Sequence, residues 1–159
     1  MSAETLQDGK TDLAWDWRPW PAFSSEEVYA LLAARSAVFV VEQRCPYQEL
    51  DGRDLGAWHL VTWAGKNKVR AALRVLPPIG EERAAIGRVL VMPPWRGRGI
   101  GLALMREGIA RCRGEFGPLP IKVAAQAHLQ RFYSELGFVP AGPTYDEDGI
   151  LHIDMLLTA

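Results

Sequence analysis

A glycine-rich, basic turn is the segment of this sequence best suited to chemistry. It reads Val89-Leu90-Val91-Met92-Pro93-Pro94-Trp95-Arg96-Gly97-Arg98-Gly99-Ile100-Gly101 and links an apolar run to an amphipathic one. Gly97, Gly99 and Gly101 can adopt backbone angles that other residues avoid, and they place no Cβ in the way of a ligand. Amides at the start of a helix have no partner within it and lie at the positive end of its dipole. The turn therefore predicts a phosphate-binding site.

The charge balance of the whole chain would not attract a phosphate, so phosphate binding would depend on the residues near the turn. The 159 residues include 18 Lys+Arg and 19 Asp+Glu, for a net charge of −1, which provides no global field to attract nucleic acid. From residue 96 to residue 113, however, there are five arginines and a single acidic residue, Glu107. A solvated strand-to-helix turn is the structural alternative to anion binding.

Two known phosphate motifs do not fit this turn. The dinucleotide fingerprint GxGxxG, counted from Gly97, would need glycine where the chain has Leu102. The loop of nucleoside triphosphatases needs GxxxxGK followed by Ser or Thr, and no such string occurs. Both of these classes are excluded.

Hydrophobic periodicity predicts the elements that position the turn. Strands are predicted at residues 13–19, 58–63, 69–75, 84–92, 121–125 and 150–157. Helices are predicted at about 25–40, 100–113 and 129–136. Ser24 and Glu27 form a capping box at the first helix, with Phe23 and Val28 as its hydrophobic staple. The order of these elements predicts a mixed α/β architecture with helices packed on one central sheet.

Length and composition limit the class of protein. A chain of this size forms one core, so we expect one domain at residues 13–159 behind a flexible, polar segment at 1–12. No apolar run approaches the length of a membrane span, and the N-terminus lacks the order of a signal peptide, so the cytoplasm is the expected location. Cys45 and Cys112 lack metal-ligand spacing, which predicts free thiols and no metal site.

Two motifs together resemble a known family. Arg96-x-x-Gly99-x-Gly101 resembles the [Q/R]xxGx[G/A] acetyl-coenzyme A loop of the GNAT superfamily of N-acetyltransferases, and Tyr133-x-x-x-Gly137-Phe138 resembles its second signature. From about residue 24 to the end, the chain is similar to the ElaA-like subgroup. That similarity is carried by Val38-Phe39-Val40-Val41-Glu42-Gln43, Cys45-Pro46-Tyr47, Asp51-Gly52, His59, Ala125-Gln126-Ala127-His128-Leu129-Gln130 and Glu147-Asp148-Gly149-Ile150.

The resemblance implies a fold and a cosubstrate. The implied acyl-CoA N-acyltransferase (GNAT) fold has a mostly antiparallel central sheet, helices on both faces and a parallel pair, here about 83–92 and 121–125, that splays into a V. Acetyl-CoA would enter the V, and no metal is implied. Its pantetheine arm would pair with the backbone of Leu90, Val91 and Met92. The expected pyrophosphate and remaining cofactor contacts are Arg96, Gly97, Arg98, Gly99, Ile100, Gly101, Gln126, Phe132 and Tyr133. Many family members carry an asparagine near the start of the last helix, where this chain has Gln126 and His128.

The implied reaction is direct acetyl transfer to a primary amine of a small molecule or peptide. A backbone amide near Val91 would stabilise the developing oxyanion, and Tyr133 would protonate the departing sulfur. Glu42 ranks first as the candidate general base, because an acidic residue within an apolar run is otherwise unexplained. His59 in a strand is also a candidate, with a hydrogen-bonded structural histidine as the alternative. The other open candidates are Glu49, Asp51 and His152.

Two other functions compete with this enzyme. One is a non-catalytic CoA-binding sensor or interaction module, and the other is a nucleic-acid binder that uses the arginine cluster, which the net charge disfavours. No membrane or nucleic-acid partner is expected, and a monomer and a homodimer both remain open.

Overall fold

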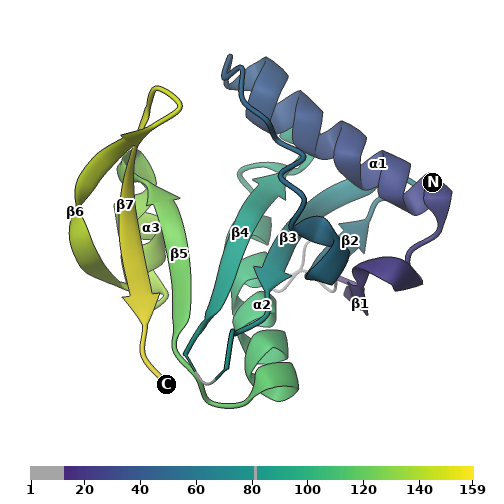
Figure 1. Cartoon of the computed structure of the whole chain (residues 1–159). Coiled ribbons are helices and arrows are strands. Elements are labelled where there is room, and N and C mark those ends of the chain that lie inside the picture. Colours follow the sequence, from purple (N-terminus) through teal and green to yellow (C-terminus); the bar gives the residue numbers. More distant parts are fainter. Residues whose placement is uncertain (1–12, 81) are drawn as a thin grey trace.

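A twisted mixed sheet organises the protein. The computed structural model describes residues 13–80 and 82–159, so the predicted segment 1–12 lies outside the described residues. Within the described residues the sheet has seven strands in the order β1-β2-β3-β4-β5-β7-β6 (Figure 1). They are β1 (Asp16–Pro19), β2 (Trp58–Trp63), β3 (Val69–Leu76), β4 (Ala84–Val91), β5 (Ile121–Gln126), β6 (Val139–Glu147) and β7 (Ile150–Leu157). All neighbours are antiparallel except β4 and β5, which are parallel.

Helices cover both faces of the sheet. The first face is covered by α1 (Ser25–Arg35), which continues as the π-helical segment η2 (Ser36–Glu42). The opposite face is covered by α2 (Ile100–Phe116) and α3 (Gln130–Glu135), seen behind the sheet in Figure 1. The predicted capping box is confirmed. Ser24 Oγ accepts from the Glu27 amide at 3.2 Å, and a Glu27 carboxylate oxygen accepts from the Ser24 amide at 2.9 Å.

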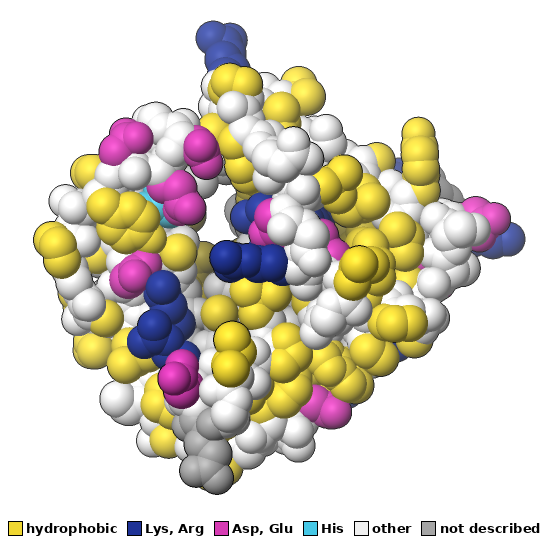
Figure 2. Space-filling model, viewed as in Figure 1, with side chains coloured by type: hydrophobic (Ala, Val, Ile, Leu, Met, Phe, Trp, Pro, Cys, Tyr) yellow, Lys and Arg dark blue, Asp and Glu magenta, His cyan; other side chains and the backbone are white. Residues whose placement is uncertain are grey.

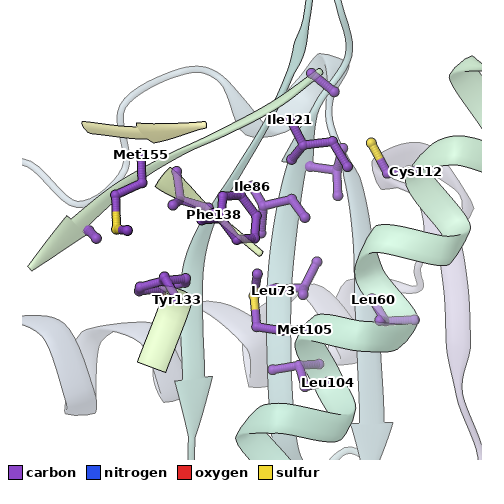
Figure 3. Packing of buried hydrophobic residues seen from close by; sticks show 14 of the residues in the cluster. Leu60, Leu73, Ile86, Leu104, Met105, Cys112, Ile121, Tyr133, Phe138 and Met155 are labelled. Atoms are coloured by element: carbon purple, nitrogen blue, oxygen red, sulfur yellow. The ribbon is translucent and has the colours of Figure 1, made fainter. Parts of the chain in front are cut away.

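An apolar cluster lies on each side of the sheet. The larger cluster joins β3, β4, β5 and β7 to α2 and α3, and its buried members include Leu73, Met105, Phe138 and Met155 (Figure 3). A Cβ added at Gly108 would lie 2.6 Å from a methyl carbon of Leu73, so glycine is what lets α2 approach β3 this closely. The smaller cluster lies under α1. Each helical layer is therefore held against the sheet by its own apolar core, and the site forms within the sheet itself.

The parallel pair opens along its length. β4 and β5 pair only where Ala84–Ile86 runs beside Ile121–Val123, and beyond these residues the two strands diverge (Figure 1). On its other side β4 carries a bulge, since Ala72 faces Leu90 while Arg74 faces Gly87. Arg88 occupies the bulge with φ of +50°, a left-handed conformation that is unfavourable for a residue with a side chain. The expected splayed pair is confirmed.

The strand β6 was not predicted from the sequence. It contains Pro140, Gly142 and Pro143, which read as loop residues. β6 is an edge strand with one free side, where a proline costs no ladder hydrogen bond, and its register shifts between Pro140 and Thr144. The remaining predicted elements are confirmed to within a few residues at their ends.

Candidate active site

The phosphate loop presents a row of free amides. Gly97 and Gly99 have φ of +75° and +76°, and Gly99 is the N-cap of α2. Among the described residues, the first amide of α2 that makes a hydrogen bond is that of Ala103, which donates to Gly99 O at 3.1 Å, so the amides of residues 100–102 have no partner. No atom lies within 4 Å of the positions that a Cβ would take at Gly97 and Gly99. This open cradle fits a diphosphate.

The end of β4 presents a backbone edge to the same region. Met92 donates its amide to Arg70 O of β3 at 2.9 Å. Because backbone groups alternate along a strand, the amide of Val91 points to the opposite side, toward the opening between β4 and β5. Arg96 Nε donates to Val91 O at 2.8 Å and so ties the loop to the strand. The structure therefore brings the predicted residues of the strand and the loop together.

A cavity of about 550 Å³ occupies the opening and reaches both faces of the sheet. Its walls include Val89 of β4, Ala124 of β5, Tyr133 of α3 and His152 of β7. The segment that follows η2 forms a further wall through Cys45, Tyr47, Gln48, Asp51 and Arg53. Figure 2 shows the hollow, with basic and acidic side chains gathered at its mouth. We call this cavity the cleft.

Tyr133 brings an unpaired phenol into the cleft. Its side chain packs edge to face against Phe132 and Phe138, with ring centroids 5.1 and 5.9 Å away. Within the described residues its hydroxyl has no hydrogen-bond partner. Burial raises the pKa of Tyr133 to about 12, so the phenol stays protonated at neutral pH. A protonated hydroxyl in a cavity wall is suited to donate a proton or a hydrogen bond.

Beside the cleft, three arginines and three carboxylates alternate in a closed ring. Its successive ion pairs are Arg35–Glu49 (2.5 Å), Glu49–Arg88 (2.9 Å), Arg88–Asp51 (3.3 Å), Asp51–Arg74 (2.8 Å), Arg74–Asp54 (3.4 Å) and Asp54–Arg35 (2.6 Å). We call this set the charge ring. It joins α1, β3 and the β4 bulge to the segment that forms the cleft wall. Asp51, Arg74 and Arg88 also line the cleft.

Sequence reasoning missed the charge ring as a unit. Only Glu49 and Asp51 were weighed, as candidate bases, and both prove to be ring members held by arginines. Three arginines in positions where apolar residues are expected did indicate buried charge. Arg35 interrupts the apolar stripe of α1, and Arg74 and Arg88 lie in strands. Buried cations need paired carboxylates, but the sequence does not say which ones.

The two first candidates for the general base lie outside the cleft. Glu42 is 42% exposed and forms an ion pair with Arg96 at 3.0 Å. His59 is 1% exposed, its Nε2 lies 3.2 Å from Asp54 Oδ1, and burial lowers its pKa. The structure therefore does not bring Glu42 and His59 to Tyr133.

Gln126 and the two cysteines have defined environments. Gln126 Nε2 donates to Gln43 Oε1 at 3.2 Å, which joins the end of β5 to the end of η2. Cys45 and Cys112 are buried free thiols, and burial raises the pKa of Cys112 to about 11. In the part of the chain that the structure describes, no group of three or more potential ligands is placed to hold a metal ion. Nor do the described residues include a helix long and apolar enough to cross a membrane.

The charge ring predicts an acid-sensitive stability. Burial acts to raise the pKa of Asp51, but hydrogen bonds from Arg74 and from the Arg53 amide outweigh it and hold this pKa at about 2. The unfolded value is about 3.9, so ionised Asp51 stabilises the fold above about pH 4, and this stabilisation disappears as the pH falls toward 2. We expect Asp51→Asn to lower the free energy of unfolding at pH 7 but not at pH 2, as measured by urea titration. The exposed control Glu115→Gln should change neither value, and a deficit of Asp51→Asn that is equal at both pH values would contradict this assignment.

Comparisons with known proteins identify the class. The chain belongs to the GNAT acetyltransferase family, because the family model described as an acetyltransferase (GNAT) domain matches residues 22–159. It is 42% identical over 134 residues to Protein ElaA of Escherichia coli (strain K12), covering 83% of this chain and 88% of the relative. The resemblance to the ElaA-like subgroup is thereby confirmed.

Solved structures agree with this assignment. The crystal structure of an acyl-CoA N-acyltransferase from Pseudomonas aeruginosa has a TM-score of 0.87 and 40% identity, covering 92% of this chain and 100% of that one. The crystal structure of Escherichia coli ElaA has a TM-score of 0.85 and 39% identity, covering 91% and 99%. The expected acyl-CoA N-acyltransferase fold is confirmed, and the family supports acyltransferase activity in general.

Proposed function

We propose that this protein is an acetyl-CoA-dependent N-acetyltransferase that acts on a primary amine of a small molecule or a peptide. The observation that carries the proposal is the arrangement around the opening between β4 and β5. The cleft in this opening is lined by Val89 of β4 and by the phenol of Tyr133, and β4 continues through the outward amide of Val91 to the unpartnered amides at the start of α2. Each part matches one portion of an acyl-CoA: the diphosphate, the pantetheine arm and the thioester.

The binding residues follow from this match. Gly97, Arg98 and Gly99 would hold the diphosphate through their amides, together with those of Ile100 and Gly101. Within the edge of Leu90, Val91 and Met92, the amide of Val91 faces the opening and would bind the pantetheine arm as an added strand does, while Met92 donates its amide to β3. Arg96 buttresses the loop through Val91 O and Glu42. Phe132 packs within 4 Å of the Cβ position of Gly101, and Gln126 stands at the end of β5 beside the cleft.

The catalytic groups follow from the cleft. When bound, acetyl-CoA supplies a thioester whose acyl group an amine can accept. The amide of Val91 would donate a hydrogen bond to the oxygen on which negative charge develops. Tyr133 would give its proton to the departing sulfur. The apolar rings around Tyr133 keep competing hydrogen-bond partners away from its hydroxyl.

The direct test is acyl transfer itself. Purified protein is mixed with acetyl-CoA and a panel of primary alkylamines, arylalkylamines and peptides with free N-termini. We expect thiol release that depends on the amine, and an amine product that has gained one acetyl group by mass spectrometry. CoA binding without thiol release across the panel would favour the non-catalytic sensor.

The cradle gives a second test, made by calorimetry with CoA. Gly99→Val places a branched side chain at φ of +76° among the free amides, and we expect the dissociation constant for CoA to rise at least tenfold, since one fewer strong anion contact costs about 1.4 kcal/mol or more. The matched control is Gly117→Val at the other end of α2, where φ is +89° and no atom lies within 4 Å. The control also forces a β-branched residue to a positive φ, and with ψ of −176° its backbone is at least as unfavourable for valine as that of Gly99. It should nevertheless keep its CoA affinity. Normal affinity in Gly99→Val would contradict the assigned pocket.

A further inference from the structure

His152 places an imidazole on the side of the cleft that faces α1. It lies on β7 opposite Gln126 of β5, lines the cavity and has a side chain that is 13% exposed. Ile153 and Met155 of the same strand are buried with α3 on the other face. Since side chains alternate along a strand, His152 and Tyr133 reach the cleft from opposite faces of the sheet.

The surroundings fix the tautomer of His152. Its Nδ1 lies 2.7 Å from Ile150 O. A carbonyl oxygen can only accept, so Nδ1 carries the hydrogen and, in the neutral ring, Nε2 keeps the lone pair. The ring also stacks on Tyr145, with centroids 6.0 Å apart and an interplanar angle of 24°. These two contacts fix the orientation of the imidazole ring, and with it the direction in which the Nε2 lone pair points.

The carboxylate of Glu147 lies near Nε2 of His152. Glu147 Oε2 is 3.7 Å from His152 Nε2, too long for a hydrogen bond but close enough to attract a cation. The other charged groups near the imidazole are already paired, since Asp154 binds Lys122 and Tyr145. On the opposite wall, Asp51, Arg74 and Arg88 are paired within the charge ring. Asp148 also lines the cleft, but Glu147 is the unpaired acid within ion-pair distance of His152 Nε2, so we assign the incoming ammonium group to Glu147.

We propose that Nε2 of His152 is the general base of the acetyl transfer and that Glu147 is a positioning residue that draws the protonated amine to it. The proposal rests on the function proposed above. An alkylamine has a pKa near 10.4, so only about one molecule in a few thousand is neutral at pH 7, and a base is needed to supply the reactive form.

The protons balance as follows. The ammonium group gives one proton to His152 Nε2, and the neutral nitrogen then forms a bond to the acyl carbon. The carbon–sulfur bond breaks, its electron pair stays on sulfur, and sulfur takes the proton of Tyr133. The second proton lost by the nitrogen restores the phenol, and His152 returns its proton to solvent. The products are the amide, the free thiol and one released proton.

The other candidate bases lack one of these features. His59 and Glu42 lie outside the cleft, and Glu49 is bound by two arginines of the charge ring. Asp51 lines the cleft but is also held by two arginines. His152 combines access to the cleft with a lone pair that no group holds.

The test compares His152→Gln with the control His128→Gln, which changes an exposed histidine that does not line the cleft. With an amine that the wild type accepts, we expect His152→Gln to lower kcat/KM for the amine tenfold or more at pH 7. The deficit should shrink as the pH rises toward the pKa of the amine, because the amine then loses its proton without help. CoA affinity by calorimetry should stay unchanged, and His128→Gln should match the wild type. Glu147→Gln should raise the KM for the amine while kcat is retained.

A second measurement needs no activity. Nitrogen-resolved NMR of the imidazoles in the free protein at pH 8 should show His152 protonated at Nδ1, and a ring protonated at Nε2 would overturn the proposal. So would wild-type kcat/KM in His152→Gln at pH 7, and that result would leave acetyl transfer itself intact. Failure of the wild type to release thiol with any amine of the panel would instead refute the proposed function, and this proposal with it.

Discussion

Tyr133→Phe should lower kcat about a hundredfold or more and leave the affinity for CoA unchanged. The substitution removes one oxygen atom and keeps the edge-to-face packing against Phe132 and Phe138. The lost hydroxyl has no protein partner among the described residues, so no buried group is left unsatisfied. Its loss removes the proton donor for the departing sulfur, and positioned acids of this kind typically contribute 10²- to 10⁴-fold.

The measurement is steady-state kinetics together with calorimetric titration of CoA. The matched control is Tyr29→Phe, which removes the hydroxyl of an exposed tyrosine of α1 outside the set of cleft-lining residues. We expect that variant to keep most of its turnover. If Tyr133→Phe turned over acetyl-CoA at the wild-type rate, the phenol would have no part in the chemistry.

Arg35→Met should cost about 3–5 kcal/mol of stability, the range expected when one partner of a buried ion pair is removed. Arg35 is 2% exposed and donates to both carboxylate oxygens of Glu49 and of Asp54. Methionine fills part of its volume but leaves two buried acids short of a cation. Arg35 also anchors the cleft wall, so KM for the amine should rise in the variant.

The control for Arg35→Met is Arg18→Met. Arg18 likewise bridges two carboxylates, those of Asp16 and Glu27, but its side chain is 29% exposed. Partly exposed ion pairs contribute roughly 0–1 kcal/mol, so the loss in the control should be several times smaller. Urea unfolding at pH 7 measures both values. Equal losses would show that the charge ring contributes no more than a surface pair.

The sequence predicted the elements whose signals are local. The capping box at Ser24 and Glu27 placed the start of α1, and the glycine-rich turn placed the start of α2. β6 escaped prediction because its prolines are excluded from a central strand but tolerated at an edge, and edge position is a property of the whole sheet. Similarly, the last turns of the first helix are π-helical, which periodicity does not distinguish from a regular helix.

The residues of the site likewise fall into those predicted from local motifs and those that only the fold brings together. The phosphate loop and Tyr133 belong to short motifs and were predicted. The charge ring joins residues between 14 and 39 positions apart, and such pairings depend on the register of strands and on the path of a loop. Of the candidate bases, the structure shows that His152 and Asp51 share a cavity with Tyr133, and that Asp51 is held by two arginines.

The opening between β4 and β5 passes through the sheet, with the phosphate loop on the side of α2 and the imidazole of His152 on the side of α1. In the proposed reaction, acetyl-CoA and the amine would therefore enter the cleft from opposite faces of the sheet. The binding of one substrate would then not block the other, and the amide and the thiol would leave toward opposite faces of the sheet.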